Sequence, residues 1–389
     1  MSSKLVFITS YPPRECGIAT YSKDLIHALK GACGNSFDPV VCALESNTHH
    51  TYGSPVHYTL CTAEPEDYIR VAREISHASH VKAVFVQHEF GLFGGSYGNY
   101  LLLLLYNIQK PVVVTFHTVL PSPNAEIRET VRAIASVSAR IIVMTRHAFN
   151  ILLTDYQLPA ELLTIIPHGT HPAPLVPKEK LRTWYKVPPT SRILATFGLL
   201  GRGKNIETAL DALPDIVREF PDTLYLIIGK THPEVLKHEG EAYRDFLKAR
   251  IAALHIADYV QFIDEYVSLA ELLEYLTLTD LYLFTSKDPN QAVSGTFVYA
   301  LSCGCPVVST PIPHAKELLA ANVGRMVDFE QPKQLADATI TLLKSPSLMQ
   351  QMRDNSLKLM APTVWSRVAA LHVHVFKDVL LHSAYAEAH

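Results

Sequence analysis

The chain has 389 residues, of which 48% are hydrophobic and 18% are charged. This composition excludes a disordered chain, and the length favours two domains over a single core. The formal net charge of -3 argues against a nucleic-acid binder, because such proteins usually carry a basic domain or stripe. The six cysteines include no CxxC pair, which favours reduced thiols over a metal site.

The first part of the chain alternates short apolar runs with amphipathic stretches of helix length. Strands are predicted at 4–9, 40–43, 83–87, 112–116, 141–144 and 163–166. Helices are predicted at 21–29, 64–75, 97–108, 124–135 and 146–153. Nearly continuous Val, Ile and Leu in a strand is typical of a parallel sheet buried on both faces, and the alternation with helices indicates repeated βαβ units.

A break follows at 167–177, where four prolines forbid a helix and indicate a linker. The pattern then restarts, with strands predicted at 192–197, 223–228, 259–263, 281–284, 306–309 and 324–327. Helices are predicted at 206–217, 241–253, 295–301, 334–343 and 348–359. A last amphipathic stretch, 364–381, predicts a helix that returns to the first domain.

We therefore expect an α/β protein of two doubly wound, Rossmann-like domains. The first would comprise 1–168 with the C-terminal helix 366–389, and the second 169–365. In open α/β sheets, ligands bind beyond the carboxyl ends of the strands. We expect the active site in the cleft between the domains, formed by loops at those ends.

Three loops of the first domain carry polar residues after a strand. In 11–20, Arg14 lies beside Gly17, which would let the backbone approach a ligand at a helix N-terminus, unless this is an ordinary turn. In 87–95, His88 and Glu89 precede a Gly-rich stretch suited to sugar hydroxyls, unless the pair only braces the loop. His117 lies at the mouth of its strand, which favours a functional role over a core position.

Two loops of the second domain could bind anions. Gly201, Arg202 and Lys204 directly precede a helix and predict a phosphate cradle made of backbone donors, helix dipole and positive charge. The spacing excludes a Walker A loop, and a solvated basic turn is the alternative. The run Ser294–Thr296 at the start of the next helix predicts a second anion site, or a helix cap alone.

Four segments together resemble the retaining glycosyltransferases of the family 4 type, which have the GT-B fold. These segments are YPPRECGIATYSKDL, IIPHGT, FGLLGRGKNIETALDAL and GTFVYALSCGCPVVSTPIPHAKELL. The resemblance covers essentially the whole chain. It implies a nucleotide-sugar donor held mainly by the second domain, an acceptor held mainly by the first, and no metal.

The resemblance also implies roles for single residues. Lys204 matches the lysine that binds the donor diphosphate, His117 the histidine near the donor sugar, and Gly17 the glycine of the first loop. The arginine of the family falls on Leu199, and Arg202 is expected to substitute for it.

The paired glutamates of the family fall on Gln291 and Tyr299. Gln291 can still hydrogen-bond a sugar hydroxyl, whereas Tyr299 offers no carboxylate for a nucleotide ribose. Ser294 and Thr296 add hydroxyl groups where the phosphate is expected.

The candidates fall into three groups, and no metal ligand is among them. The catalytic candidates are Lys204, Arg202 and His117. The donor- and phosphate-binding candidates are Gly17, Gly201, Gln291, Ser294, Gly295, Thr296 and Tyr299. The acceptor- and sugar-binding candidates are Arg14, His88, Glu89 and Gly94.

We expect a retaining, metal-independent hexosyltransferase that moves a sugar from a nucleotide-sugar donor to a hydroxyl acceptor without a cofactor. A glycoside phosphorylase using phosphate or a sugar 1-phosphate is the alternative, and an inactive sugar-binding protein is a second. A nucleotide-dependent oxidoreductase is excluded, because neither domain has GxGxxG followed by an acidic residue about 20 positions on.

The expected partners are a small-molecule sugar donor and a carbohydrate or lipid-linked acceptor, with no nucleic acid. The most apolar run, 101–105, is far shorter than the roughly 20 residues of a transmembrane helix. Peripheral contact with a membrane surface stays open, although no strongly basic amphipathic helix supports it. The first ten residues enter a strand pattern directly, so we expect a cytoplasmic protein without a targeting segment.

Overall fold

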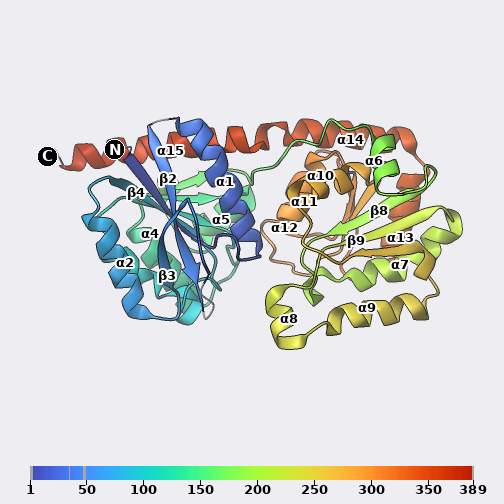
Figure 1. The fold of residues 1–389 in the computed structure, drawn as a ribbon, viewed down its shortest axis with the longest axis horizontal. Helices are drawn as coiled ribbons and strands as arrows, with labels where there is room; N and C mark the ends of the chain where they lie inside the picture. Colours follow the sequence, from blue (N-terminus) through green and yellow to red (C-terminus); the bar gives the residue numbers. More distant parts are fainter. Residues whose placement is uncertain (1–2, 35, 47–49, 388–389) are drawn as a thin grey trace. The chain divides into compact units, whose positions relative to one another are not determined.

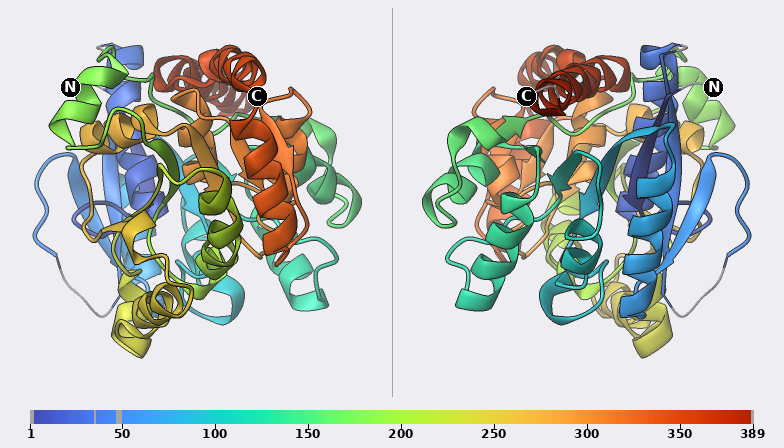
Figure 2. Two further views of the ribbon diagram at one scale, coloured as in Figure 1. Left: turned by 90° about the vertical axis from the view of Figure 1, so that its right-hand side faces the viewer. Right: turned by 90° about the vertical axis from the view of Figure 1, so that its left-hand side faces the viewer.

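The computed structural model describes residues 3–34, 36–46 and 50–387. These residues form two compact units, Met1–Gly169 with Thr363–His389, and Thr170–Pro362. Each unit is a parallel sheet with helices on both faces, as the ribbons of Figures 1 and 2 show. The prediction of two doubly wound α/β domains is confirmed. No helix in the described part of the chain is long and apolar enough to cross a membrane.

The sheet of the first unit has seven strands in the order β3-β2-β1-β4-β5-β6-β7. The strands are β1 Ser3–Thr9, β2 Phe37–Glu45, β3 Val56–Cys61, β4 Val81–His88, β5 Val112–Phe116, β6 Arg140–Val143 and β7 Leu163–Ile165. The helices are α1 Gly17–Cys33, α2 Pro65–His77, α3 Leu101–Leu105, α4 Ala125–Ser136, α5 Arg146–Thr154 and the final α15 Trp365–Glu387. The strand order reverses between β1 and β4, which is the point where such sheets bind ligands.

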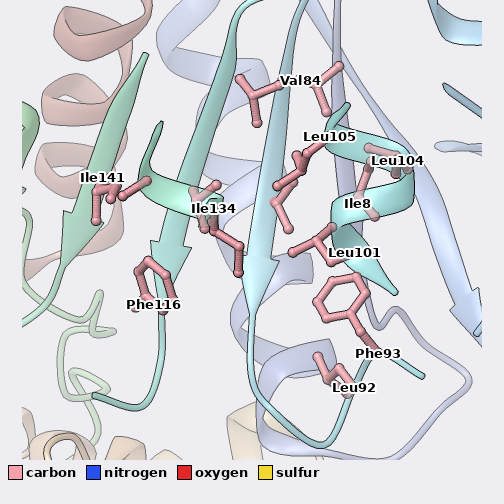
Figure 3. Packing of buried hydrophobic residues seen from close by; sticks show 14 of the residues in the cluster. Ile8, Val84, Leu92, Phe93, Leu101, Leu104, Leu105, Phe116, Ile134 and Ile141 are labelled. Carbon is pink, nitrogen blue, oxygen red and sulfur yellow. The ribbon is translucent and has the colours of Figure 1, made fainter. Parts of the chain in front are cut away.

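Alternate side chains of these strands enter two apolar layers. Ile8 and Val84 belong to the apolar cluster that Figure 3 shows, together with Leu101 and Phe116. Residues that point to the opposite face meet α15, where the rings of Phe85 and Phe376 lie 4.1 Å apart. Burial on both faces explains why these strands read as continuous apolar runs.

One strand of this unit was not predicted, and one expectation for the unit was wrong. The edge strand β3 was not predicted because, apart from the buried Leu60, its residues are half-buried or exposed, so it lacks the apolar run of the inner strands. The helix predicted at 97–108 is confined to α3, because Tyr97 and Gly98 have φ values of 49° and 78°, which a helix does not allow.

The sheet of the second unit has six strands in the order β10-β9-β8-β11-β12-β13. They are β8 Arg192–Phe197, β9 Thr223–Ile228, β10 Val260–Ile263, β11 Leu281–Phe284, β12 Val307–Ser309 and β13 Gly324–Met326. Its helices are α6 Lys178–Trp184, α7 Ile206–Glu219, α8 Pro233–Glu239, α9 Ala242–Ala253, α10 Leu269–Leu278, α11 Gly295–Ser302, α12 Pro313–Leu319, α13 Pro332–Leu343 and α14 Pro346–Met360. Here the strand order reverses between β8 and β11.

The second unit also buries both faces of its sheet. Ile193 and Leu194 are neighbours on β8 and belong to two separate apolar clusters, one on each face. The helices α6, α8, α10 and α12 were not predicted, although α10 begins with a capping box of Ser268 and Glu271. These elements leave the loops after β8 and β11 at the reversal point of the sheet, and those loops contain the predicted anion-binding residues.

Candidate functional site

The turn after β8 begins with a close backbone contact. Gly198 and Gly229, which directly follow β8 and β9, both have φ of 129°, a conformation that favours glycine. A Cβ atom on Gly229 would lie 2.3 Å from the carbonyl oxygen of Gly198. The two strand ends therefore pack backbone against backbone, and this leaves room for a side chain on the other side of Gly198.

Lys204 fills that room. The chain turns through a short 3₁₀ helix at Arg202–Lys204, and Asn205 adopts a left-handed conformation before α7 begins. Lys204 Nζ lies 2.8 Å from the point where a Cβ of Gly198 would be, and Thr296 Cγ2 lies 3.1 Å from the same point. The structure thus brings together the glycine-and-lysine turn and the start of α11.

The ammonium group of Lys204 has no carboxylate partner among the described residues. Burial, which disfavours the charged form, lowers the pKa of Lys204 to about 8. A half-buried cation without a counter-ion is costly, and an anionic ligand would offset that cost. The position of Lys204 therefore favours a phosphate site.

The first turn of α11 supplies further donors. Ser294 caps the helix, because its Oγ accepts a hydrogen bond from the N–H of Phe297 at 3.3 Å and lies 3.1 Å from Thr296 Oγ1. The N–H of Ser294 donates to Nδ1 of the buried His314 at 3.0 Å. The N–H groups of Gly295 and Thr296 precede the helical hydrogen-bond pattern and are oriented as anion donors.

The loop from β11 to α11 is tied to the lysine turn. Thr285 Oγ1 donates to the carbonyl oxygen of Lys204 at 2.8 Å. The backbone N–H of Lys287 donates to the carbonyl oxygen of Gly203 at 3.2 Å. Ser286 Oγ donates to Oε1 of Gln291 at 2.7 Å. These bonds hold the two anion-binding loops in one arrangement.

Two predicted residues of this unit lie away from Lys204, and a third position does not require its glycine. Arg202 is exposed, forms an ion pair with Glu239 on α8 at 3.5 Å and lies over the ring of Tyr243, so it does not replace the missing arginine at Lys204. Tyr299 is 5% exposed, within an apolar cluster and against His171, so it does not line a ligand surface. A Cβ on Gly201 would meet only Val235, at 3.6 Å, so a larger residue fits there.

In the first unit, the loop after β1 leads into α1. The N–H of Arg14 donates to the carbonyl oxygen of Tyr11, and Cys16 Sγ accepts weakly from the N–H of Ala19 at 3.4 Å. Apart from the chain neighbours and the backbone of the helix itself, no atom of the described residues lies within 4 Å of a Cβ built on Gly17, so the start of α1 is open. This arrangement leaves donors for a ligand at the reversal point between β1 and β4.

The loop after β4 separates its predicted sugar-binding residues. The His88 ring is fully buried among Phe90, Phe93 and Phe116, and neither ring nitrogen has a hydrogen-bond partner among the described residues. Burial lowers the pKa of His88 to about 3, so the ring is neutral. Contrary to the expectation, His88 packs the loop and does not reach a ligand.

Glu89 and Gly94 also have local roles. Glu89 accepts hydrogen bonds from Thr118 Oγ1 at 2.6 Å and from the N–H of Phe90 at 3.0 Å, and burial raises the pKa of its carboxyl group. Glu89 therefore pairs with Thr118 and not with His88. A Cβ on Gly94 would lie 2.2 Å from the carbonyl oxygen of Thr62, so that position requires glycine for packing.

Replacing His88 with leucine tests this reassignment. The change removes two buried nitrogens that lack partners, and leucine is of similar size and apolar. We expect the free energy of unfolding to rise by about 1 kcal/mol, with activity retained. Urea unfolding and an activity assay measure both quantities, and loss of activity in a stably folded variant would restore His88 to the site.

His117 lies beside this loop, half-buried at the end of β5. Its Nε2 is 2.8 Å from Gln87 Oε1, and its ring meets the edge of Tyr21 at a centroid distance of 4.9 Å. Tyr21 also contacts His168 and Trp365. Gln87 and Tyr21 were not predicted as site residues, because Gln87 belongs to a predicted strand and Tyr21 to the apolar face of a predicted helix.

The carboxyl ends of both sheets thus carry polar groups at their reversal points.

Residues 177–359 match the model of the family described as glycosyl transferases group 1. Spore coat protein SA of Bacillus subtilis is 25% identical over 194 residues. This match covers 48% of this chain and 48% of that protein, so it spans about half of each. Phosphatidyl-myo-inositol mannosyltransferase of Mycobacterium leprae is 23% identical over 281 residues, which cover 70% of this chain and 68% of that protein.

The fold is also that of a solved structure. Anabaena Alr3699/HepE in complex with UDP-glucose has a TM-score of 0.73 at 15% sequence identity, with 96% of this chain and 99% of that chain covered. This chain therefore has the GT-B fold, and residues 177–359 of its second unit are similar to the glycosyl transferases group 1 family.

Proposed function

We propose that this protein is a retaining glycosyltransferase that moves a hexosyl group from a nucleotide-sugar donor to a hydroxyl group of an acceptor. The observation that carries the proposal is the ammonium group of Lys204, which lies beside the first turn of α11 and has no carboxylate partner in the part of the chain that the structure describes. The match of residues 177–359 to a glycosyl transferase family supports it. A UDP-glucose complex of a protein with the same fold, and a relative named as a mannosyltransferase, agree with a hexosyl donor.

In the proposed reaction, the bond between the sugar and the phosphate loosens and positive charge develops on the anomeric carbon. Lys204 and the N–H groups of Gly295 and Thr296 stabilise the leaving phosphate. The hydroxyl groups of Ser294 and Thr296 lie 3.1 Å apart and share one hydrogen bond, so together they supply one further donor. The acceptor hydroxyl attacks from the same face and transfers its proton to the leaving phosphate oxygen. This reaction uses no protein nucleophile.

The first unit is proposed to hold the acceptor and to orient the donor sugar. The open start of α1 at Gly17 and the polar groups of Arg14 and Glu89 lie on loops at the reversal point. His117 is neutral and half-buried at the end of β5, as expected of a group that orients a sugar.

A glycoside phosphorylase is a second candidate. Tyr299 is buried and Gln291 is bound to Ser286, so these two positions offer no carboxylate to a nucleotide ribose, whereas the hydroxyl groups of Ser294 and Thr296 suit a phosphate of any origin.

A donor panel tests both functions. UDP-glucose, GDP-mannose, glucose 1-phosphate and mannose 1-phosphate would each be offered with a mixture of sugar acceptors, and released nucleotide or phosphate measured. Turnover of a nucleotide sugar supports the transferase, and turnover of a sugar 1-phosphate alone supports the phosphorylase. Binding without turnover of any donor would contradict both and favour a sugar-binding protein.

The proposal predicts an alkaline limit to activity. Lys204 attracts the donor phosphate only when it is protonated, and its pKa of about 8 means that the charge is lost as the pH rises through 8. We expect kcat/KM to fall above about pH 8. In Lys204→Arg the fall should vanish, because a guanidinium group stays charged. If kcat/KM of Lys204→Arg still falls above about pH 8 as in the wild type, the fall is due to the titration of another group.

A further inference from the structure

The two ring nitrogens of His117 have different surroundings. Nε2 lies 2.8 Å from Gln87 Oε1, and Gln87 is 1% exposed on β4. An amide oxygen only accepts hydrogen bonds, so this contact requires the proton of a neutral His117 ring to be on Nε2. The N–H of His117 also donates to the carbonyl oxygen of His88 at 3.0 Å, which fixes the backbone beside the ring.

The other ring nitrogen of His117 is Nδ1, and the residue as a whole is half-buried. No hydrogen-bond partner for Nδ1 lies among the described residues, and Nδ1 is not one of their buried polar atoms that lack a partner. With the proton on Nε2, Nδ1 presents a lone pair at the carboxyl end of β5, where ligands of such sheets bind.

The groups around the ring keep it neutral. Tyr21 approaches from α1, His88 from the end of β4 and His168 from the end of the first unit, while the nearby Glu89 is engaged by Thr118. Burial, with smaller contributions from His168 and His88, lowers the pKa of His117 to about 3. Nδ1 therefore stays an acceptor at neutral pH.

We propose that Gln87 is a positioning residue that holds His117 in the Nε2-protonated tautomer, so that Nδ1 accepts a hydrogen bond from a hydroxyl group of the sugar substrate. A lone pair repels the oxygens of a phosphate, so the group that Nδ1 recognises carries an O–H and no negative charge. The identity of the ligand in this inference rests on the proposed function. The tautomer of His117 is independent of that function.

Gln87→Glu is the main test, because glutamate has nearly the same shape. A carboxylate still accepts the Nε2 proton, but it also stabilises the doubly protonated ring and raises the pKa of His117. Once Nδ1 is protonated it can no longer accept a hydrogen bond. As the pH is lowered from about 8 to about 5.5, we expect kcat/KM of Gln87→Glu to fall about tenfold. The wild type should show no such decline on the acidic side of its pH profile.

Gln87→Met is the matched control. Methionine keeps the volume but accepts no comparable hydrogen bond, so the tautomer is released and activity should be about tenfold lower at every pH. A purely structural role of Gln87 would lower activity without a new dependence on pH in either variant. Thermal melting of both variants separates loss of folding from loss of positioning.

Nitrogen NMR of histidine side chains reads the tautomer without any substrate. In ¹⁵N-labelled wild type at pH 7, assigned by comparison with His117→Gln, we expect protonated Nε2 and unprotonated Nδ1. A proton on Nδ1, or a charged ring, would overturn the role of Gln87. If the tautomer is as expected but Gln87→Glu shows the wild-type pH profile, the contact with a sugar hydroxyl is wrong. If no donor turns over, the proposed function fails while the NMR result stands by itself.

Discussion

Replacing Lys204 with methionine is expected to lower kcat/KM by a factor of about 100 to 1,000, which corresponds to the loss of one preorganised donor to a developing anion. The fold should be retained. Lys204 is a half-buried cation, and the residues that the structure describes offer it no carboxylate partner, so removing its charge removes a cost of folding. Steady-state kinetics and thermal melting of the same samples measure the two effects.

Arg202→Met is the matched control, because both residues belong to the same 3₁₀ turn. Arg202 is exposed and paired with Glu239, so its loss should change kcat/KM by less than about threefold. Equal losses in the two variants would mean that the turn acts as a general basic patch. Activity of Lys204→Met close to that of the wild type would remove Lys204 from the mechanism.

Gly229→Ala is expected to destabilise the second unit strongly. The new Cβ would lie 2.3 Å from the carbonyl oxygen of Gly198, and a φ of 129° is strained for alanine. Together these effects predict a loss of about 3 kcal/mol or more in the free energy of unfolding, and weaker donor binding as the Gly198 turn shifts. Urea unfolding and titration with UDP-glucose measure them.

Gly201→Ala provides the comparison within the same turn. Gly201 has an extended backbone with φ of -173°, and its Cβ would meet only Val235, at 3.6 Å. Its urea midpoint should match that of the wild type or lie slightly higher, because alanine restricts the unfolded chain. Similar midpoints for Gly229→Ala and the wild type would show that the close backbone contact is not required.

The fold was predictable from the sequence to the extent that its strands are buried on both faces. The runs at 223–228 and 281–284 coincide with β9 and β11, because inner strands of a parallel sheet exclude polar residues. The edge strand β3 lacks this signal, and the short helices α8 and α12 are marked only by a proline at their start. Such short elements depend on tertiary packing more than on local pattern.

The meeting of Lys204 with the start of α11 followed from topology. Both belong to loops after strands that flank the reversal point, β8 and β11, so their backbones had to converge. The directions in which the side chains point could not be predicted from the topology. Arg202 turns toward Glu239 on α8, and His88 turns into an aromatic cluster, and neither partner is a neighbour in sequence.

The residues that support the site were the least visible in the sequence. His314 accepts a hydrogen bond from the N–H of Ser294, and Gln87 accepts one from His117, yet each lies on a different element from the group that it holds. Such contacts depend on how elements pack, which a single sequence does not reveal.

A structure of the protein with UDP-glucose tests the central claim most directly. We predict that an oxygen of the diphosphate lies within hydrogen-bonding distance of Lys204 Nζ and of the N–H groups of Gly295 and Thr296. A diphosphate bound away from Lys204, with its ammonium group still unpaired, would contradict the proposed site.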